Sequence, residues 1–386
     1  NLSLEVHGID TSWDEGHGLD MESYKDVGFA NWTNRKEGST WTTAGAVDVG
    51  SVVQATANFD LGTEDLEVDL TSFFQTNWNA DPETAFVIKF SSTDTDDSGS
   101  ATPNFYTKKF FARSSEFFFK RPVIEVRRQD AVEDNRGNFY KASSGLSATD
   151  NQRKLYFYNS VNGVRKSLEI PVGSALAVRL YQDSTYTTAF SPDLFATASE
   201  TTTGSGIYVA TVTVPEATAL TKVYDRWYIS ADAGATETSI LKEGSIKVLT
   251  RDFSTDSGNT EYVLDVINMK PSYLRTEKPK FRVYTRAKDW SPTIYTVASK
   301  EIENLIIDKI YYKIVRLVDD AVVVDYGNGT SALNKEHTLL SYDASGSYFD
   351  FDMSSLESGY MYGIKFMLSV NGELKEQDEV FKFRVD

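Results

Sequence analysis

The densest group of side chains that could do chemistry lies near the start of the chain, in residues 13–22. Four carboxylates gather there, those of Asp14, Glu15, Asp20 and Glu22. Oxygen ligands in this number suit a hard cation such as Ca²⁺, which takes about six to eight oxygens. A pair of them could instead serve glycoside hydrolysis, and the glycines between them are equally typical of a surface loop anchored by Trp13. These three interpretations stay open, and no cofactor other than Ca²⁺ is indicated.

Elsewhere the chain is poor in groups that carry catalysis. It has no cysteine, which excludes thiol nucleophiles, disulfides and Cys-ligated zinc. Its three histidines, His7, His17 and His337, have no partner at the spacing of metal ligands. No phosphate-binding glycine loop, nucleophile elbow or zinc-binding helix motif is found. We therefore expect no catalytic residues and a protein that is not an enzyme.

Aromatic residues make up 13% of the chain and could bind a partner by stacking or packing rather than by catalysis. Three tryptophans in the first part of the sequence, Trp13, Trp32 and Trp41, could present flat faces that stack on sugar rings or contact a partner protein. These residues are the candidate contact residues for a carbohydrate or a protein partner.

Charge narrows the choice of partner. The net charge of −17 disfavours binding to nucleic acid or to anionic lipid. One basic stretch, residues 108–128, interleaves lysine and arginine with phenylalanine. Charged outer faces of strands explain this pattern, and so does a contact surface for an acidic partner protein. No run of about 18 apolar residues is present, so no membrane insertion through a helix is expected.

Short runs rich in β-branched and aromatic residues dominate the rest of the sequence and predict strands. They are separated by clusters of Gly, Asn, Asp and Ser at intervals of roughly 8–15 residues, which is typical of β-sandwiches. The clearest runs are 86–90, 154–158, 176–181, 207–214, 281–284, 310–315 and 380–385. The sequence therefore predicts an all-β fold of tandem β-sandwiches. One short amphipathic helix is expected near residues 69–78, capped by Asp69 or Thr71.

Three local structures can be predicted by residue. Asn162-Gly163 and Asn371-Gly372 each lie between two strand-like runs, and Asn-Gly supplies the two positive-φ residues of a type I′ hairpin. Tyr362 stands at the start of a strand after Leu356 and Gly359, where it is either a tyrosine corner or an ordinary core tyrosine.

Polar stretches without periodicity divide the chain. Residues 129–153 and 250–260 are of this kind and predict a linker or long loop. The expected domains are 1–128, 129–250 and 251–386, and the last two have the size of an immunoglobulin-like domain. The chain opens directly on a strand-like run, Leu2–Val6, so we expect the first domain to begin upstream.

The order of several motifs in the first 122 residues resembles the DNRLRE-type jelly-roll domain, a family similar to carbohydrate-binding jelly rolls. The motifs are Trp13–Gly16, Asn31–Thr33, Trp41–Gly45, Leu66–Thr71, Phe86–Lys89, Phe111–Ser114 and Pro122. This resemblance implies a partial jelly roll that lacks its upstream part. It transfers no individual sugar-binding residue to this chain.

The remainder resembles virion structural proteins of tailed bacteriophages, particularly marine ones. The residues that carry this likeness are Pro171–Gly173, Leu180-Tyr181, Trp227, Gly244–Ile246, Trp290–Thr296 and Tyr348–Asp350. The resemblance implies a non-enzymatic protein located in the virion, present in multiple copies and bound to other virion proteins of the head, neck or tail. The alternative is a carbohydrate-binding adhesin or tail receptor-binding module that contacts a host-surface glycan.

Overall fold

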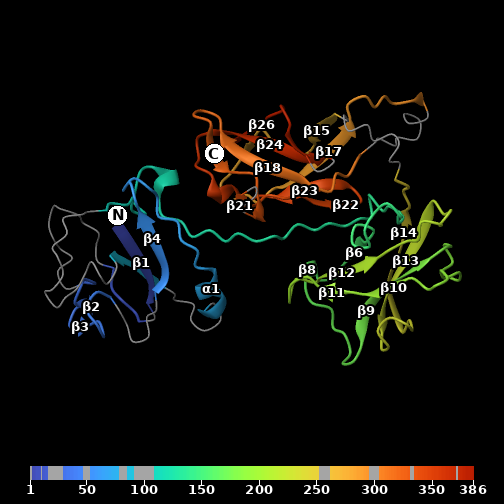
Figure 1. Cartoon of the computed structure of the whole chain (residues 1–386), viewed down its shortest axis with the longest axis horizontal. Helices are drawn as coiled ribbons and strands as arrows, with labels where there is room; N and C mark the ends of the chain where they lie inside the picture. Colours follow the sequence, from blue (N-terminus) through green and yellow to red (C-terminus); the bar gives the residue numbers. More distant parts are fainter. Residues whose placement is uncertain are drawn as a thin grey trace. The chain divides into compact units, whose positions relative to one another are not determined.

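The strands and helices of the protein were located in a computed structural model (Figure 1). It describes residues 2–9, 11–15, 29–46, 53–77, 85–90, 108–251, 261–294, 304–330, 334–370 and 373–386. The chain divides into two compact units, Asn1–Ser115 and Glu116–Asp386. The fold is all-β, as the sequence predicts, with α1 (Thr71–Asn77) as the α-helix of the described residues.

The first unit is built on an antiparallel sheet. Strand β1 (Leu2–Ile9) lies between β4 (Val53–Phe59) and β5 (Ala85–Phe90). Alternation along β1 buries Leu4 and Val6 on the same face. A small hairpin, β2 (Asn34–Lys36) and β3 (Ser39–Thr40), stands apart from this sheet in the hydrogen-bond pattern.

Helix α1 packs its aromatic side chains on the sheet of the first unit. Asp69 Oδ1 accepts a hydrogen bond from the backbone N–H of Thr71 at 2.9 Å, which satisfies one free donor of the first turn. The rings of Phe73 and Phe74 lie 5.0 and 5.6 Å from that of Phe86 on β5. The predicted helix is thus present within residues 69–78, although Trp78 lies outside the described residues.

The second unit contains two sandwiches, each with its own core. In the middle sandwich, β10 (Phe195–Thr197), β9 (Ala175–Tyr181), β13 (Lys222–Ser230) and β14 (Ser239–Lys247) form one sheet. The facing sheet contains β11 (Ser199–Glu200), β12 (Ile207–Val212) and β6 (Arg153–Tyr158). Their inner faces meet around Trp227, Leu155 and Leu176, which are fully buried.

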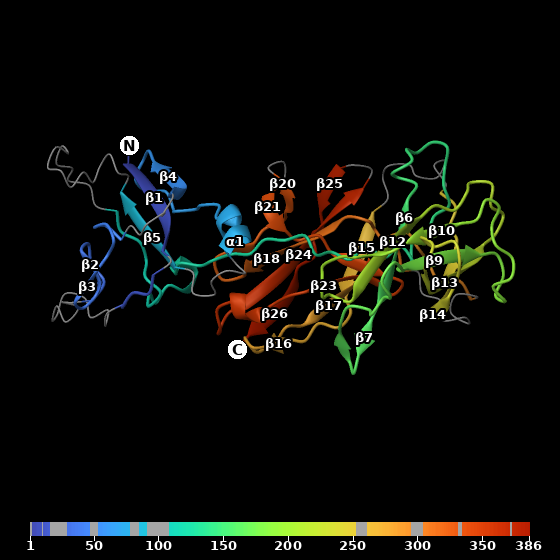
Figure 2. The ribbon, with the colours of Figure 1, turned by 90° about the horizontal axis from the view of Figure 1, so that it is seen from below.

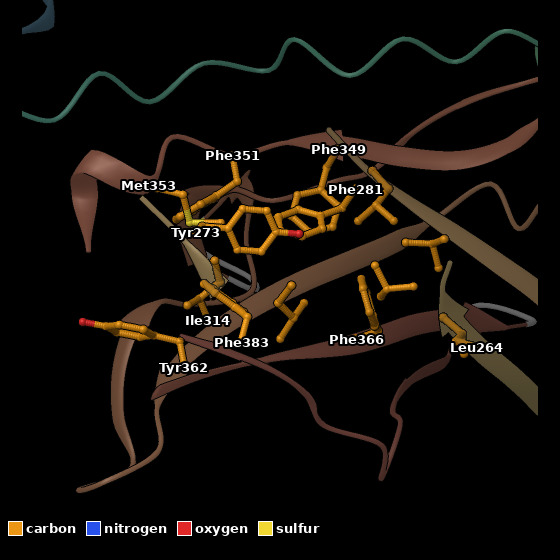
Figure 3. Packing of buried hydrophobic residues seen from close by; sticks show 14 of the residues in the cluster. Leu264, Tyr273, Phe281, Ile314, Phe349, Phe351, Met353, Tyr362, Phe366 and Phe383 are labelled. Carbon is orange, nitrogen blue, oxygen red and sulfur yellow. The ribbon is translucent and has the colours of Figure 1, made fainter. Parts of the chain in front are cut away.

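The C-terminal sandwich repeats this arrangement. One sheet has the order β15 (Tyr262–Val266), β17 (Lys280–Ala287), β23 (Gly346–Asp350) and β22 (Ser341–Asp343). The other has the order β16 (Ser272–Tyr273), β26 (Phe381–Val385), β24 (Met361–Val370), β18 (Ile310–Arg316) and β19 (Ala321–Val324), and β25 (Glu373–Glu376) also pairs with β24. Aromatic rings fill the space between the sheets (Figure 3).

The two sandwiches share one topology. In the C-terminal sandwich β16 runs parallel to the last strand, β26, which is the pairing of the divided first strand in an immunoglobulin-like domain. In the middle sandwich a parallel bridge joins Tyr140 to Leu249 in the equivalent place.

Two small hairpins complete the second unit. Strands β20 (Asn328–Thr330) and β21 (Asn334–His337) pair with each other in the C-terminal sandwich. In the middle sandwich, β7 (Ser160–Val161) and β8 (Val164–Arg165) are joined by Asn162 and Gly163, whose φ angles of 52° and 80° are those of a type I′ turn. Figure 2 shows this hairpin projecting from the sandwich. Asn371 and Gly372 lie outside the described residues, between the paired residues Val370 and Glu373.

Tyr362 forms a tyrosine corner. Its hydroxyl donates to the backbone oxygen of Glu357 at 2.8 Å and accepts from the Glu357 N–H at 3.0 Å. The ring is fully buried, and burial raises the pKa of the Tyr362 hydroxyl to about 12. The side chain therefore ties the start of β24 to the turn that precedes it.

The segment that enters the second unit differs most from expectation. The first unit ends at Ser115, before the predicted boundary at residue 128. A 3₁₀ turn, Phe118–Lys120, and the extended chain after it belong with the second unit (Figure 1, teal). Residues 132–139, predicted as part of a linker or loop, have no regular structure but include Asp134, Asn135 and Phe139 in buried positions.

Candidate functional site

Two of the predicted tryptophans lie on joined loops of the first unit. Trp13 and Trp32 are 40% and 43% exposed. Their loops are tied by backbone hydrogen bonds, from Asp14 N–H to the Arg35 oxygen at 3.0 Å and from Ala30 N–H to the Asp14 oxygen at 3.1 Å. The loop of residues 29–36 is thus held beside the one that carries Trp13.

Trp32 is positioned by the glycine that faces it. A Cβ on Gly45 would come within 2.9 Å of the Trp32 ring, and Gly45 has a φ of 90°, so this position favours glycine on both counts. The Gly45 N–H also donates to the Trp32 backbone oxygen at 2.7 Å. One side of the ring therefore packs on the backbone while nearly half of the side chain stays exposed.

The expectation for Trp41 is wrong. Its side chain is only 6% exposed, and its indole Nε1–H donates to the backbone oxygen of Asn31 at 2.8 Å. A buried ring with its polar edge satisfied cannot stack on a sugar, so Trp41 supports the Asn31 turn. The candidate contact surface is reduced to Trp13 and Trp32, which we call the two-tryptophan surface.

The carboxylates of residues 13–22 are described only in part. Asp20 and Glu22 lie outside the described residues. Glu15 forms an ion pair with Arg113 at 2.9 Å, and both side chains are exposed. Among the described residues no group of three or more metal-ligating side chains comes together. The Ca²⁺ interpretation stays a prediction.

Sequence reasoning missed an extensively hydrogen-bonded polar group, which lies where the two sandwiches of the second unit meet. We call it the junction, residues 132–139 with their partners. Arg136 donates to both carboxylate oxygens of Asp225, at 3.0 and 2.5 Å. Asp225 on β13 is fully buried and also accepts from the Trp227 indole N–H at 2.9 Å. One side of the junction is thereby anchored in the middle sandwich.

The other side of the junction binds the C-terminal sandwich. The backbone N–H of Asp134 donates to the Tyr342 oxygen at 3.0 Å, and the Tyr342 N–H donates to the Val132 oxygen at 2.8 Å, so this stretch pairs alongside β22 in a short parallel bridge. Asn138 Nδ2 donates to Asp308 Oδ1 at 2.6 Å. Asn135 donates to both Asn138 and the Tyr342 hydroxyl. The segment is therefore hydrogen-bonded to both sandwiches at once.

Burial changes the protonation chemistry of one carboxyl in the junction. Burial raises the pKa of the Asp134 carboxyl to about 6. The charge of Arg136 and a hydrogen bond from the Arg136 backbone N–H act in the opposite direction and lower this pKa. The Arg136 Nε lies 3.8 Å from the Asp134 carboxylate, because the same guanidinium makes its bidentate contact with Asp225. Asp134 is thus a buried acid whose charge is only partly compensated.

Within the described part of the chain, no helix has the length and apolar character needed to cross a bilayer.

Comparison with known proteins gives little guidance. No protein family and no curated protein matches the chain. Among solved structures, trypsin-activated alpha-2-macroglobulin from Escherichia coli aligns with a TM-score of 0.19 and 12% identity, over 66% of this chain and 17% of that one. The D1–D4 ectodomain fragment of ICAM-5 aligns with a TM-score of 0.15 and 10% identity, over 64% of this chain and 44% of that one. The chain spans less than half of either protein, and the sandwich architecture rests on the sheets described above.

Proposed function

We propose that this chain is a non-enzymatic structural or accessory component of a tailed-phage particle, assembled in multiple copies on the head, neck or tail. The observation that carries the proposal is the junction. A chain that only tethers two domains needs a flexible polar linker, whereas Asp134, Asn135 and Asn138 are buried and the segment is hydrogen-bonded to both sandwiches. Such a junction holds the two sandwiches together, which suits an assembly part.

Electrostatics supports the same role. A net charge of −17 keeps a projecting protein soluble and away from packaged nucleic acid. Sandwiches also end in edge strands that can pair with a neighbouring protein. The resemblance of the sequence to virion structural proteins of tailed phages points in the same direction.

The test is the composition of the particle. Tailed particles from a phage that encodes this chain are purified on a density gradient and quantified by mass spectrometry against a capsid protein of known copy number. We expect several copies of this chain per particle, retained after washing in high salt. Peptides that are absent, or that stay below one copy per particle, would refute the proposal.

A second candidate function, a glycan-binding adhesin or receptor-binding module, is favoured by the two-tryptophan surface. Exposed indole rings provide the flat faces on which sugars stack. A glycan array probed with the full chain tests it, with the variants Trp13→Ala and Trp32→Ala expected to lose the signal. Trp290→Ala, a change in the C-terminal sandwich, is the matched control. An array on which the wild-type chain gives no signal rules this function out.

A further inference from the structure

The extended chain that crosses beside the C-terminal sandwich has an unusual surface. We call residues 121–128 the linker segment. Its apolar side chains are largely in solvent, with Val123 73%, Ile124 70% and Val126 80% exposed. The backbone groups of residues 123–126 make no hydrogen bond to another described backbone group. Because side chains alternate along an extended chain, Ile124 and Val126 face the same way. Residues 123–126 of the linker segment thus combine exposed apolar side chains with a backbone that makes no ladder hydrogen bond among the described residues.

Contacts at both ends hold this segment in place. Before it, the rings of Phe118 and Phe119 lie under the guanidinium groups of Arg275 and Arg316, at 4.9 and 4.8 Å. Near its end Arg127 pairs with a carboxylate of the C-terminal sandwich, that of Glu336, at 3.2 Å. The segment then leads into the junction. An extended chain fixed at both ends has already lost much of the entropy that strand pairing costs, so it is preorganised to bind.

Charge indicates what could pair with the segment. It carries three arginines and one glutamate, a net charge of +2, within a chain whose net charge is −17. An acidic strand edge is its natural complement. The C-terminal sandwich has such an edge in β25 and the residues that follow it, 373–379, which hold four acidic residues and one lysine.

The edge at 373–379 is also accessible. All four residues of β25 are exposed, and Leu374 is 49% exposed. Among the described strands β25 pairs with β24 alone, which leaves its other side open. An incoming strand would place its apolar face on Leu374 and the exposed Arg128 guanidinium beside the carboxylates.

We propose that the linker segment of one copy of this chain adds as a strand to the β25 edge of a second copy. The proposal rests on the proposed function, because a multi-copy particle part needs a contact between copies. Donor and acceptor are different surfaces, so the contact is head-to-tail and builds chains or a ring rather than a closed dimer. A ladder of four residues is weak by itself, and the repetition of copies on a particle would strengthen it.

The experiment is sedimentation velocity of the full chain over about 1–100 µM, the range in which weak pairing appears. We expect a concentration-dependent series of oligomers that shrinks at high salt, since exposed charges are screened. Ile124→Asp, Arg128→Glu and Glu373→Lys should each weaken association by about tenfold or more. The double variant Arg128→Glu/Glu373→Lys, which exchanges the charges, should restore much of it.

The matched control is Val172→Asp, which places a charge on a fully exposed valine of the middle sandwich and should leave association unchanged. A wild-type chain that stays monomeric throughout, or an Ile124→Asp variant that associates like wild type, would overturn the proposal. Circular dichroism of each variant separates loss of contact from loss of fold. Presence in particles is measured separately, so monomeric behaviour in solution together with several copies per particle would sink this contact and leave the proposed function standing.

Discussion

Replacing Asp225 tests whether the junction stabilises the second unit. The Asp225 carboxylate is fully buried. It accepts two hydrogen bonds from Arg136 and one from the Trp227 indole N–H. Removing one partner of a buried ion pair typically costs about 3–5 kcal/mol, because the other charge is left uncompensated. Asp225→Asn removes the charge but keeps an oxygen for the indole N–H. Asp225→Ala removes both, and should cost about 1 kcal/mol more for the lost hydrogen bond.

The assay is urea unfolding of the full chain, followed by tryptophan fluorescence and by circular dichroism. In thermal unfolding of the same chain, a loss of about 3 kcal/mol in the free energy of unfolding corresponds to a melting temperature lower by roughly 6–12 °C for a cooperative unit of this size. The matched control is Glu261→Gln, which breaks the exposed Glu261–Lys288 pair and should cost under about 1 kcal/mol. If Asp225→Asn unfolds within about 1 kcal/mol of wild type, the junction does not stabilise the unit as argued.

Three further outcomes are expected. Tyr362→Phe loses both hydrogen bonds to the Glu357 backbone and should lower the free energy of unfolding by about 1–3 kcal/mol in the same urea assay. Folding raises the pKa of Asp134 from 3.8 to about 6, so the folded chain binds this proton more tightly than the unfolded chain. The free energy of unfolding should therefore increase by up to about 3 kcal/mol as pH falls from 7 towards 4, and this gain should be lost again as pH rises through 6. Asp134→Asn should remove this part of the pH profile. Gly45→Ala forces a Cβ against the Trp32 ring and should shift the tryptophan emission and destabilise the first unit by about 1 kcal/mol, whereas unchanged emission would contradict the packing described.

Local signals in the sequence predict local structure well in this chain. Alternation of apolar and polar residues places β1 correctly, because the period of two follows directly from strand geometry, and the aromatic-rich run 154–158 places β6. The turn at Asn162-Gly163 is also predictable from local sequence, because few residue pairs adopt two consecutive positive φ angles. The corner at Tyr362 needs only a partner five residues earlier.

The junction could not be predicted, because its partners are far apart in sequence. Asn138 meets Asp308 across 170 residues, and Arg136 meets Asp225 across 89. A polar stretch without periodicity is the ordinary signature of a loop, and only the fold shows that these polar groups are buried with partners. The same limit explains Trp41. A tryptophan in a loop is equally suited to a surface or to a buried turn, and the sequence does not show that the Trp41 indole folds back onto the Asn31 backbone ten residues earlier.

An exposed extended segment with Val123, Ile124 and Val126 would ordinarily be a liability, because such segments pair indiscriminately and aggregate. Three features limit indiscriminate pairing by the linker segment. Glu125 and the flanking arginines interrupt the apolar run, as charged gatekeepers do. The acidic remainder of the chain repels other copies unless a basic segment meets an acidic edge. The fixed ends prevent the segment from folding back on itself. Together these features make pairing depend on charge as well as on shape, so an acidic strand edge such as β25 of a second copy is the partner that this segment selects.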